Sequence, residues 1–236
     1  MRKSVISMAT LAFATSVACA QTEPKAAAKN SDPDKVTATG GVMVDGWTGR
    51  LDPQSEKQGR KITDVKFVSM GKGYHITAGP AAVYWNAKDS ASGNYSVTAT
   101  FTQMKPAAHA EGYGFVTTGT NLDKSNQSYG YFLVRQDGKF LINHRADDST
   151  VHKIVPWTEN AAINKVPEGG KATNMLRVDF TQTDVVYLIN GTEVHRIPRP
   201  RIEGRDGHRG SEGVSGLRVN HNLDVHVDGF AVIPAK

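Results

Sequence analysis

Two apolar, aromatic-rich runs joined by Asp137-Gly138 constrain the fold of this chain more than any other feature. The stretch from Gln127 to Arg145 reads QSYGYFLVRQDGKFLINHR, and Asp-Gly between such runs is a strong signal for a β-hairpin. If the loop is a two-residue turn, Gln136 faces Lys139 and both faces of the hairpin are rich in apolar groups. The pattern predicts a hairpin that is central in a sheet rather than at its edge.

The two-residue register also predicts which side chains share a face of this hairpin. The expected cross-strand pairs are Arg135 with Phe140, Leu133 with Ile142, and Tyr131 with His144. On this register, Tyr131 and His144 point to the same side of the sheet.

A second hairpin is predicted around Asn190-Gly191, a dipeptide typical of type I′ turns. Residues 185–189 and 192–196 flank it with β-branched runs. The two-residue register places Tyr187 opposite Val194 on the core face, and it places His195 on the outer face.

Short strands punctuated by turn residues continue through the rest of the chain, and no long segment has helical periodicity. The other predicted strands are residues 66–70, 73–77, 82–85, 95–104, 112–118, 151–155, 174–181, 216–220 and 224–233. This pattern predicts an all-β fold, a sandwich or jelly roll of two antiparallel sheets.

The first twenty residues are typical of a secretory signal peptide. Arg2 and Lys3 precede an uncharged, mostly apolar run from Val5 to Ala18, which is too short to span a bilayer as a mature helix. We therefore expect export to a periplasm, a cell surface or the medium. No later run is long and apolar enough to predict a transmembrane segment.

The site of processing has two alternatives. Ala18-Cys19-Ala20 fits the small-x-small cleavage pattern and would leave Gln21 as the first mature residue. The alternative is a lipid anchor on Cys19, although Ser16 stands where lipoprotein signals usually carry Leu. Since Cys19 is the single cysteine, the mature domain has no disulfide.

Composition divides the remaining chain in two. Residues 21–41 are rich in Ala, Lys, Thr, Asp and Pro and predict a flexible tether. Residues 42–236 have globular composition and a length that suits one β-jelly-roll domain. The formal charge of +5 becomes +3 without Arg2 and Lys3, and this small excess does not favour nucleic acid as a partner.

The C-terminal half contains an ordered series of strand motifs: LRVDF, YLINGTEVHRI, GVSGLRVN and DVHVDGFAV. In this order they resemble concanavalin A-like jelly-roll domains, and most of all the secreted bacterial domains related to 3-keto-disaccharide hydrolases. The resemblance covers residues 73–233. It implies two packed antiparallel sheets, of which the concave one often binds or cuts glycans. The E-x-D-x-x-E stretch of laminarinase-type members is absent, which argues against their chemistry.

One group of candidate site residues follows the central hairpin. Tyr131 and Trp157 could stack on sugar rings, and Arg145 could hold hydroxyl groups. His144 is a candidate acid or base. Trp157 follows Pro156 at a predicted loop position, whereas Trp85 is predicted to lie in the core. The alternative is that these residues lie at the rim of a sheet and form exposed ion pairs, which contribute little to stability.

A second group lies near the closing strand. His221 begins a predicted rim loop and could hold hydroxyl groups. Asp224, His226 and Asp228 alternate and thus share one face. They could hold a divalent metal, or Asp224 could act as acid or base; the alternative is a solvated outer face.

These residues predict an exported domain that binds or acts on carbohydrate. Two alternatives stay open. One is a 3-keto-glycoside hydrolase or lyase, in which a base removes the proton made acidic by the keto group. The other is a surface protein without catalytic activity that docks another protein, which an aromatic patch without converging charges would favour.

Overall fold

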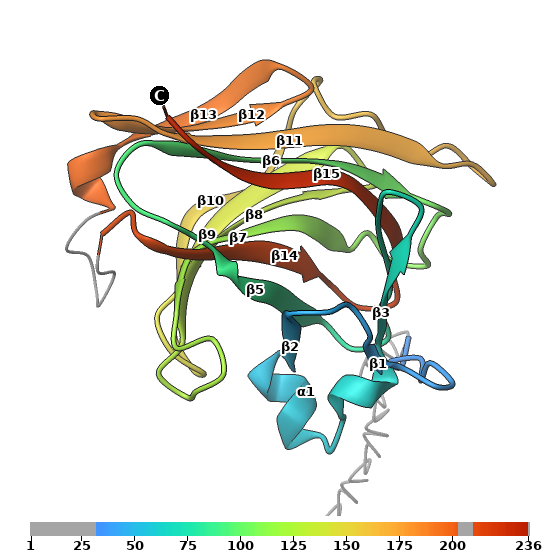
Figure 1. The fold of residues 1–236 in the computed structure, drawn as a ribbon. Helices are drawn as coiled ribbons and strands as arrows, with labels where there is room; N and C mark the ends of the chain where they lie inside the picture. Colours follow the sequence, from blue (N-terminus) through green and yellow to red (C-terminus); the bar gives the residue numbers. More distant parts are fainter. Residues whose placement is uncertain (1–31, 203–209, 236) are drawn as a thin grey trace, which may run out of the picture. The chain divides into compact units, whose positions relative to one another are not determined.

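Two β-sheets packed face to face make up the fold, as the many short strand signals predict (Figure 1). The computed structural model describes residues 32–202 and 210–235. These residues belong to one compact unit that begins at Asp32. The predicted signal peptide, residues 1–20, lies outside the described residues.

The first sheet, called sheet A, has eight strands in the described residues, and all of its pairs are antiparallel except β1 with β3. In spatial order its strands are β1 (Gly41–Val42), β3 (Lys66–Met70), β4 (Gly73–Thr77), β15 (Asp224–Pro234), β6 (Tyr95–Gln103), β11 (Ala172–Phe180), β12 (Asp184–Ile189) and β13 (Thr192–Pro198).

The second sheet, called sheet B, has seven strands in the same part of the chain, all antiparallel to their neighbours. In spatial order they are β10 (Val151–Glu159), β9 (Lys139–Arg145), β8 (Ser128–Arg135), β7 (Gly112–Thr120), β14 (Gly213–Val219), β5 (Ala82–Ala91) and β2 (Trp47–Leu51). Because β8 and β9 each have two neighbours, the prediction of a central hairpin is confirmed.

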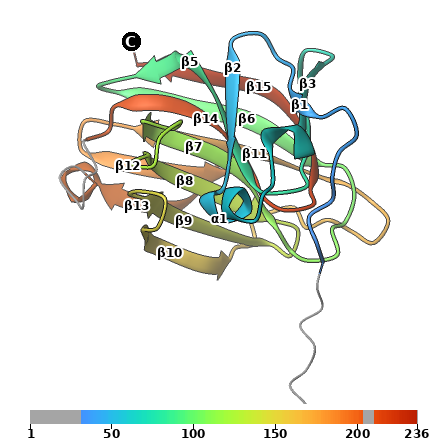
Figure 2. The same cartoon turned by 90° about the horizontal axis from the view of Figure 1, so that it is seen from below.

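In the described part of the chain, helical structure is limited to α1 (Pro53–Lys57) and two short 3-10 turns, η1 (Ile62–Asp64) and η2 (Arg199–Arg201). Seen from below, α1 lies in front of sheet B (Figure 2). No helix in the described residues is both long and apolar enough to cross a membrane.

The core lies between the sheets and is built from alternate residues of each strand. In β6 the predicted alternation is confirmed, because Tyr95, Val97, Ala99 and Phe101 are buried and the residues between them are partly exposed. Sheet B contributes Tyr84, Phe115, Phe132, Ile142 and Leu217 to the same cluster. Alternation thus gives each sheet one face toward the core.

The β8–β9 hairpin has a three-residue loop, so the predicted two-residue register is wrong. Arg135 pairs with Lys139, and Gln136 belongs to the loop. Gly138 has φ +84° and its N–H donates to the carbonyl of Arg135 at 3.1 Å. A glycine in the left-handed region closes three-residue hairpin loops. The pairing therefore slips by one residue along β9.

The slip reverses which face several side chains occupy, since neighbours along a strand point to opposite sides. Tyr131 pairs with Asn143, and His144 pairs with Gly130. Tyr131 and Arg145 therefore lie on the side of sheet B away from the core, whereas His144 lies on the core side. The predicted Tyr131–His144 pair does not form.

The β12–β13 hairpin has the predicted two-residue turn, with φ +50° at Asn190 and +82° at Gly191. A bulge follows the pair of Leu188 with Glu193, so Tyr187 pairs with His195 instead of Val194. The bulge turns His195 away from the predicted outer face, and its ring centroid lies 6.3 Å from that of Tyr187.

Residues 32–41, which the sequence assigns to the tether, contact the domain. The N–H of Lys35 donates to Asn222 Oδ1 at 2.9 Å. The Asn222 side-chain amide donates to the carbonyl of Pro33 at 3.1 Å, and His221 pairs with Asp34. The turn between β14 and β15 therefore holds residues 33–35, and the N–H groups of Thr37 and Gly41 bond to the carbonyls of Asp64 and Val65.

Candidate functional site

The side of sheet B away from the core, here called the outer face, carries an unusual number of large apolar side chains. Most outer faces of antiparallel sheets are polar and solvated. This face has a second hydrophobic cluster, separate from the core. It contains Val83, Trp85, Val116, Leu122, Tyr129, Tyr131, Leu133, Leu141, Trp157 and Val214.

A row of side chains crosses the middle of the outer face. The strand register places Trp85 beside Gly216, Gly216 beside Val116, and Val116 beside Tyr131. Asn143 follows on β9. Trp85 and Asn143 are half-buried and Tyr131 is 8% exposed. Aromatic and amide groups therefore lie in one line across five neighbouring strands.

Trp157 lies within β10, not in the predicted loop, and its indole crosses the outer face toward β7. A Cβ built on Gly112 would lie 2.9 Å from the indole Cη2 atom, so the glycine leaves room for the ring. The guanidinium of Arg135 lies over the indole at 4.4 Å from its centroid. This cation–π contact holds a half-exposed ring against the sheet.

A buried arginine supports the tyrosines of this face. Arg218 donates to both carboxylate oxygens of Asp52, at 2.7 and 2.6 Å, and to the Tyr129 hydroxyl at 3.2 Å. Its guanidinium also lies 5.0 Å from the centroid of the Tyr131 ring. Burial alone would raise the pKa of Asp52, but the charge and hydrogen bonds of Arg218 outweigh burial and lower it.

Arg145 supports the same tyrosine from the other side. Its Nε donates to the Tyr129 hydroxyl at 3.1 Å, and Nη1 donates to the carbonyls of Asp147 and Asp148 at 3.2 Å each. A second arginine, Arg50, binds the carboxylates of Asp148 and Glu56, each at 3.0 Å. The acidic groups at this edge of the face are thus already held by arginines.

Two buried polar atoms on the outer face have no hydrogen-bond partner among the described residues: Asn143 Oδ1 and Arg218 Nε. The amide nitrogen of Asn143 donates to the Tyr131 hydroxyl at 3.0 Å. This bond fixes the orientation of the amide and leaves its oxygen as an acceptor. Most buried polar groups have a hydrogen-bond partner, so each unpaired one calls for an explanation, such as an ordered water or a bound ligand.

No protein-family model and no curated protein matches this chain. Several solved structures do match it. The carbohydrate binding module CBM66 from Bacillus subtilis matches with TM-score 0.54 and 10% identity, over 80% of this chain and 95% of that one. A mixed-linkage glucan GH16 protein from Bacteroides ovatus matches with TM-score 0.53 and 9% identity, over 83% and 98%.

The endo-beta-1,3-glucanase from Pyrococcus furiosus is also similar, with TM-score 0.52 and 10% identity over 82% of this chain and 89% of that one. The fold is a concanavalin A-like jelly roll. Identities near 10% show the fold alone. The kinship to 3-keto-disaccharide hydrolases stays a prediction.

The jelly roll brings together three of the six residues singled out from the sequence. Tyr131, Arg145 and Trp157 all lie on the outer face of sheet B. His144 lies on the opposite side of β9, where it is 4% exposed, contacts Ser128 Oγ at 3.0 Å and stacks on His152. It therefore cannot share a site with Tyr131.

The other two residues lie elsewhere in the jelly roll. His221 is in the turn after β14, with Asp32 and Asp34. Asp224 is on the outer side of sheet A, where it pairs with His75 at 2.8 Å and with a lysine at 3.3 Å. The structure does not unite these residues with the hairpin residues in one site.

The predicted alternation along the closing strand is present, since Val225 and Val227 are buried and Asp224, His226 and Asp228 lie on the other side of β15. Within residues 32–202 and 210–235, no group of three or more His, Cys, Asp or Glu side chains is arranged to hold a metal ion.

Sequence reasoning missed Trp85, Asn143 and Arg218. The prediction that Trp85 is in the core is wrong, and alternation carried the signal: Tyr84 is buried in the core, so the next residue points outward. For Asn143, the one-residue error in register hid its position beside Tyr131. Nothing in the sequence joins Arg218 to Asp52.

Proposed function

We propose that this protein binds carbohydrate on the outer face of sheet B. The observation that carries the proposal is the pair of half-exposed indoles, Trp85 and Trp157, on the face that also presents Tyr131 and Asn143. Indole rings bury large apolar areas at low entropic cost, and the C–H face of a sugar ring is a matching surface. Amide and guanidinium groups between such rings suit hydroxyl groups.

The unpaired atoms of the face supply the complementary polar contacts. Asn143 Oδ1 can accept a hydrogen bond from a sugar hydroxyl, and Arg218 Nε can donate one. Arg145 and the Asp52–Arg218 pair hold Tyr129 and Tyr131 from behind, so the binding groups are fixed before a ligand arrives. Preorganisation of this kind reduces the entropic cost of binding.

The similar solved structures support a carbohydrate ligand. The module from Bacillus subtilis is named as carbohydrate binding, and the protein from Pyrococcus furiosus as a glucanase. They share the jelly roll over most of their length. The likeness supports the class of ligand and leaves the choice of sugar to experiment.

Binding is favoured over hydrolysis by the state of the acidic groups. Glycoside hydrolysis usually needs one carboxyl group as acid and a second as base or nucleophile. On this face Asp52, Glu56 and Asp148 are all engaged by arginines. The predicted catalytic pair, His144 and Asp224, lies on different sheets. Protein docking is disfavoured because charges converge on the aromatic face.

The test is binding of the full chain to a panel of soluble and insoluble polysaccharides, followed by titration calorimetry with oligosaccharides. Removal of the Trp157 ring in Trp157→Ala should weaken binding about twofold to tenfold, since stacking on an aromatic ring contributes about 0.5–1.5 kcal/mol. Asn143→Ala should weaken it about tenfold.

Thr100→Ala is the matched control, because Thr100 lies on the outer side of sheet A, remote from the proposed site. It should leave affinity unchanged. Binding that survives Trp157→Ala and Asn143→Ala at wild-type strength would refute the placement of the site on sheet B. Absence of binding to every glycan would refute the proposed function.

A further inference from the structure

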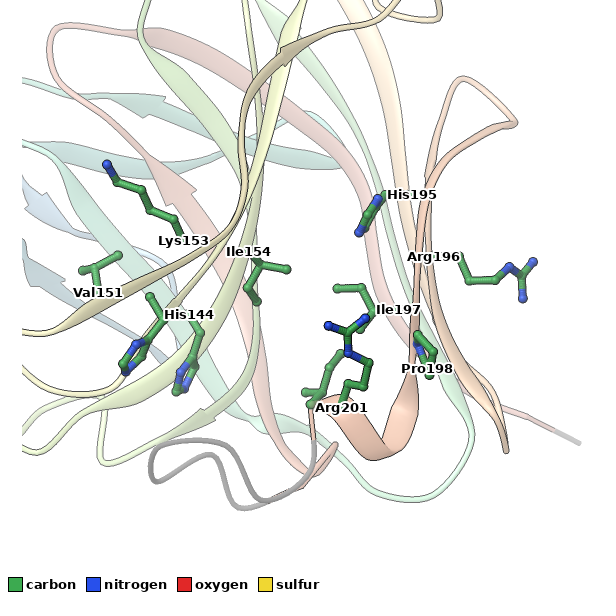
Figure 3. Close-up of a pocket in the computed structure, with 11 residues that line it drawn as sticks. His144, Val151, Lys153, Ile154, His195, Arg196, Ile197, Pro198 and Arg201 are labelled. Carbon is green, nitrogen blue, oxygen red and sulfur yellow. The ribbon is translucent and has the colours of Figure 1, made fainter.

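A cavity of about 640 Å³ opens between the edges of the two sheets, on the side of β9 opposite the outer face. One wall comes from β9 and β10 of sheet B, and the other from β13 of sheet A and the 3-10 turn η2 that follows it (Figure 3). Its volume is typical of sites for small organic ligands. The proposed carbohydrate face does not account for it.

The polar lining of the cavity is basic. His144 and His152 contribute imidazoles from sheet B, and His195 contributes one from sheet A. The guanidinium of Arg201 extends from η2 into the space between the sheets, whereas Arg196 points away from it (Figure 3). Arg196 is engaged by Glu193 at 2.7 Å.

No Asp or Glu side chain lines the cavity in the described part of the chain. No residue in this described part forms a hydrogen bond or ion pair with the guanidinium of Arg201. Burial lowers the pKa of His195, so this imidazole is neutral at pH 7. Lys153 also lines the cavity, but its side chain points away from Arg201 (Figure 3). Arg201 is therefore the positive charge that enters the space between the two walls, and His195 adds a hydrogen-bonding group to it.

The remaining walls are apolar. Ile154 faces the space from β10, and Ile197 faces it from β13 (Figure 3). A bare inorganic anion would leave these side chains without contacts. An anion with an apolar body would place its charge at Arg201 and its body against the isoleucines.

We propose that this cavity binds a small organic anion, a carboxylate or phosphate monoester with an apolar body, through Arg201 and His195. The site lies between the sheets and works independently of carbohydrate binding on sheet B. Guanidinium binds both kinds of anionic group through paired N–H donors, so comparison of two probes distinguishes them.

Calorimetric titration of the full chain with benzoate and with phenyl phosphate tests the proposal. Saturable one-to-one binding of at least one of them is expected, and the tighter probe identifies the anionic group. Benzyl alcohol, the uncharged analogue, should bind at least about tenfold more weakly, because a charge-assisted hydrogen bond contributes about 1.5–3 kcal/mol.

Arg201→Gln should weaken the tighter probe about tenfold or more. Arg196→Gln is the matched control: the same residue type and substitution on the same wall, with the side chain directed outward, and it should leave the affinity unchanged. Thermal melting of both variants checks folding, and their glycan binding should equal that of the wild type.

Three outcomes would overturn the proposal. They are absence of saturable binding by both anions, equal affinity for benzyl alcohol, and an equal effect of Arg201→Gln and Arg196→Gln. Since neither arginine lies on the outer face of sheet B, each outcome can be separated from a failure of carbohydrate binding.

Discussion

The pair of Arg218 and Asp52 shows how one buried charge organises a surface that the sequence does not reveal. Arg218 is 5% exposed, and 166 positions separate it from Asp52 along the chain. Its guanidinium joins a residue next to α1 to two tyrosines of β8. A buried cation requires such a partner, because desolvation without one is costly.

Asp52→Ala should therefore destabilise the fold by about 3 kcal/mol, because it leaves Arg218 buried without its carboxylate. The side chain of Asp52 is 21% exposed, which places the expected loss at the lower end for buried pairs. Urea unfolding at pH 7 measures the change. The matched control is Glu193→Ala, which removes an exposed partner of Arg196 and should have little effect.

The same pair should make stability depend on pH. Arg218 lowers the pKa of Asp52 in the folded state. The ion pair therefore stabilises the fold fully above the pKa that an Asp has in the unfolded chain, about 3.9. It is lost as the pH falls through the folded value. Equal loss for Asp52→Ala and Glu193→Ala at pH 7 would contradict the role assigned to Asp52.

At the scale of elements, one loop residue decides which side chains face the core. The three-residue loop of the β8–β9 hairpin shifts the register by one position relative to a two-residue turn. Tyr131 thereby joins Asn143 on the outer face, and His144 joins the inter-sheet cavity. Asp-Gly is compatible with both loops, so packing of Phe132, Phe140 and Ile142 in the core selects between them.

The turn between β14 and β15 contacts residues 32–35 of the segment that precedes β1. Asn222 has φ +53°, and its side chain bonds Lys35 and Pro33. Asn222→Gly keeps the backbone conformation and removes both bonds. We expect the free energy of local unfolding of this segment to fall by about 1–2 kcal/mol. Trypsin should then cleave after Lys35 about tenfold faster.

Asn121→Gly is the control for that experiment, since Asn121 has φ +51° and its side chain forms no hydrogen bond with the described residues. Cleavage after Lys35 should remain at the wild-type rate in this variant. Equal rates in Asn222→Gly and the wild type would show that the turn does not hold the segment.

At the scale of the whole molecule, the jelly roll has three surfaces of different chemistry. The outer face of sheet B is aromatic, the cavity between the sheet edges is basic, and the outer side of sheet A carries threonines with the His75–Asp224 pair. Side-chain alternation assigns each strand residue to one of two sides, so neighbours in sequence serve different surfaces.

Export is the proposal that concerns the chain as a whole. We expect that the protein recovered from the periplasm or medium of a bacterial host begins at Gln21, with the mass of residues 21–236. Cys19→Ser should not alter this product. Recovery of a chain that begins at an acylated Cys19 would establish the lipoprotein alternative, and retention of residues 1–20 would refute processing.

The sequence by itself determined the all-β class, most strands and both hairpins, because alternation and turn residues act over a few positions. It also marked Tyr131, Arg145 and Trp157, which the structure brings to one face. Only the tertiary structure decided the register of β8 and β9, the bulge at Val194 and the pairing of Arg218 with Asp52. These depend on packing between distant segments, where a shift of one residue reverses the direction of each side chain.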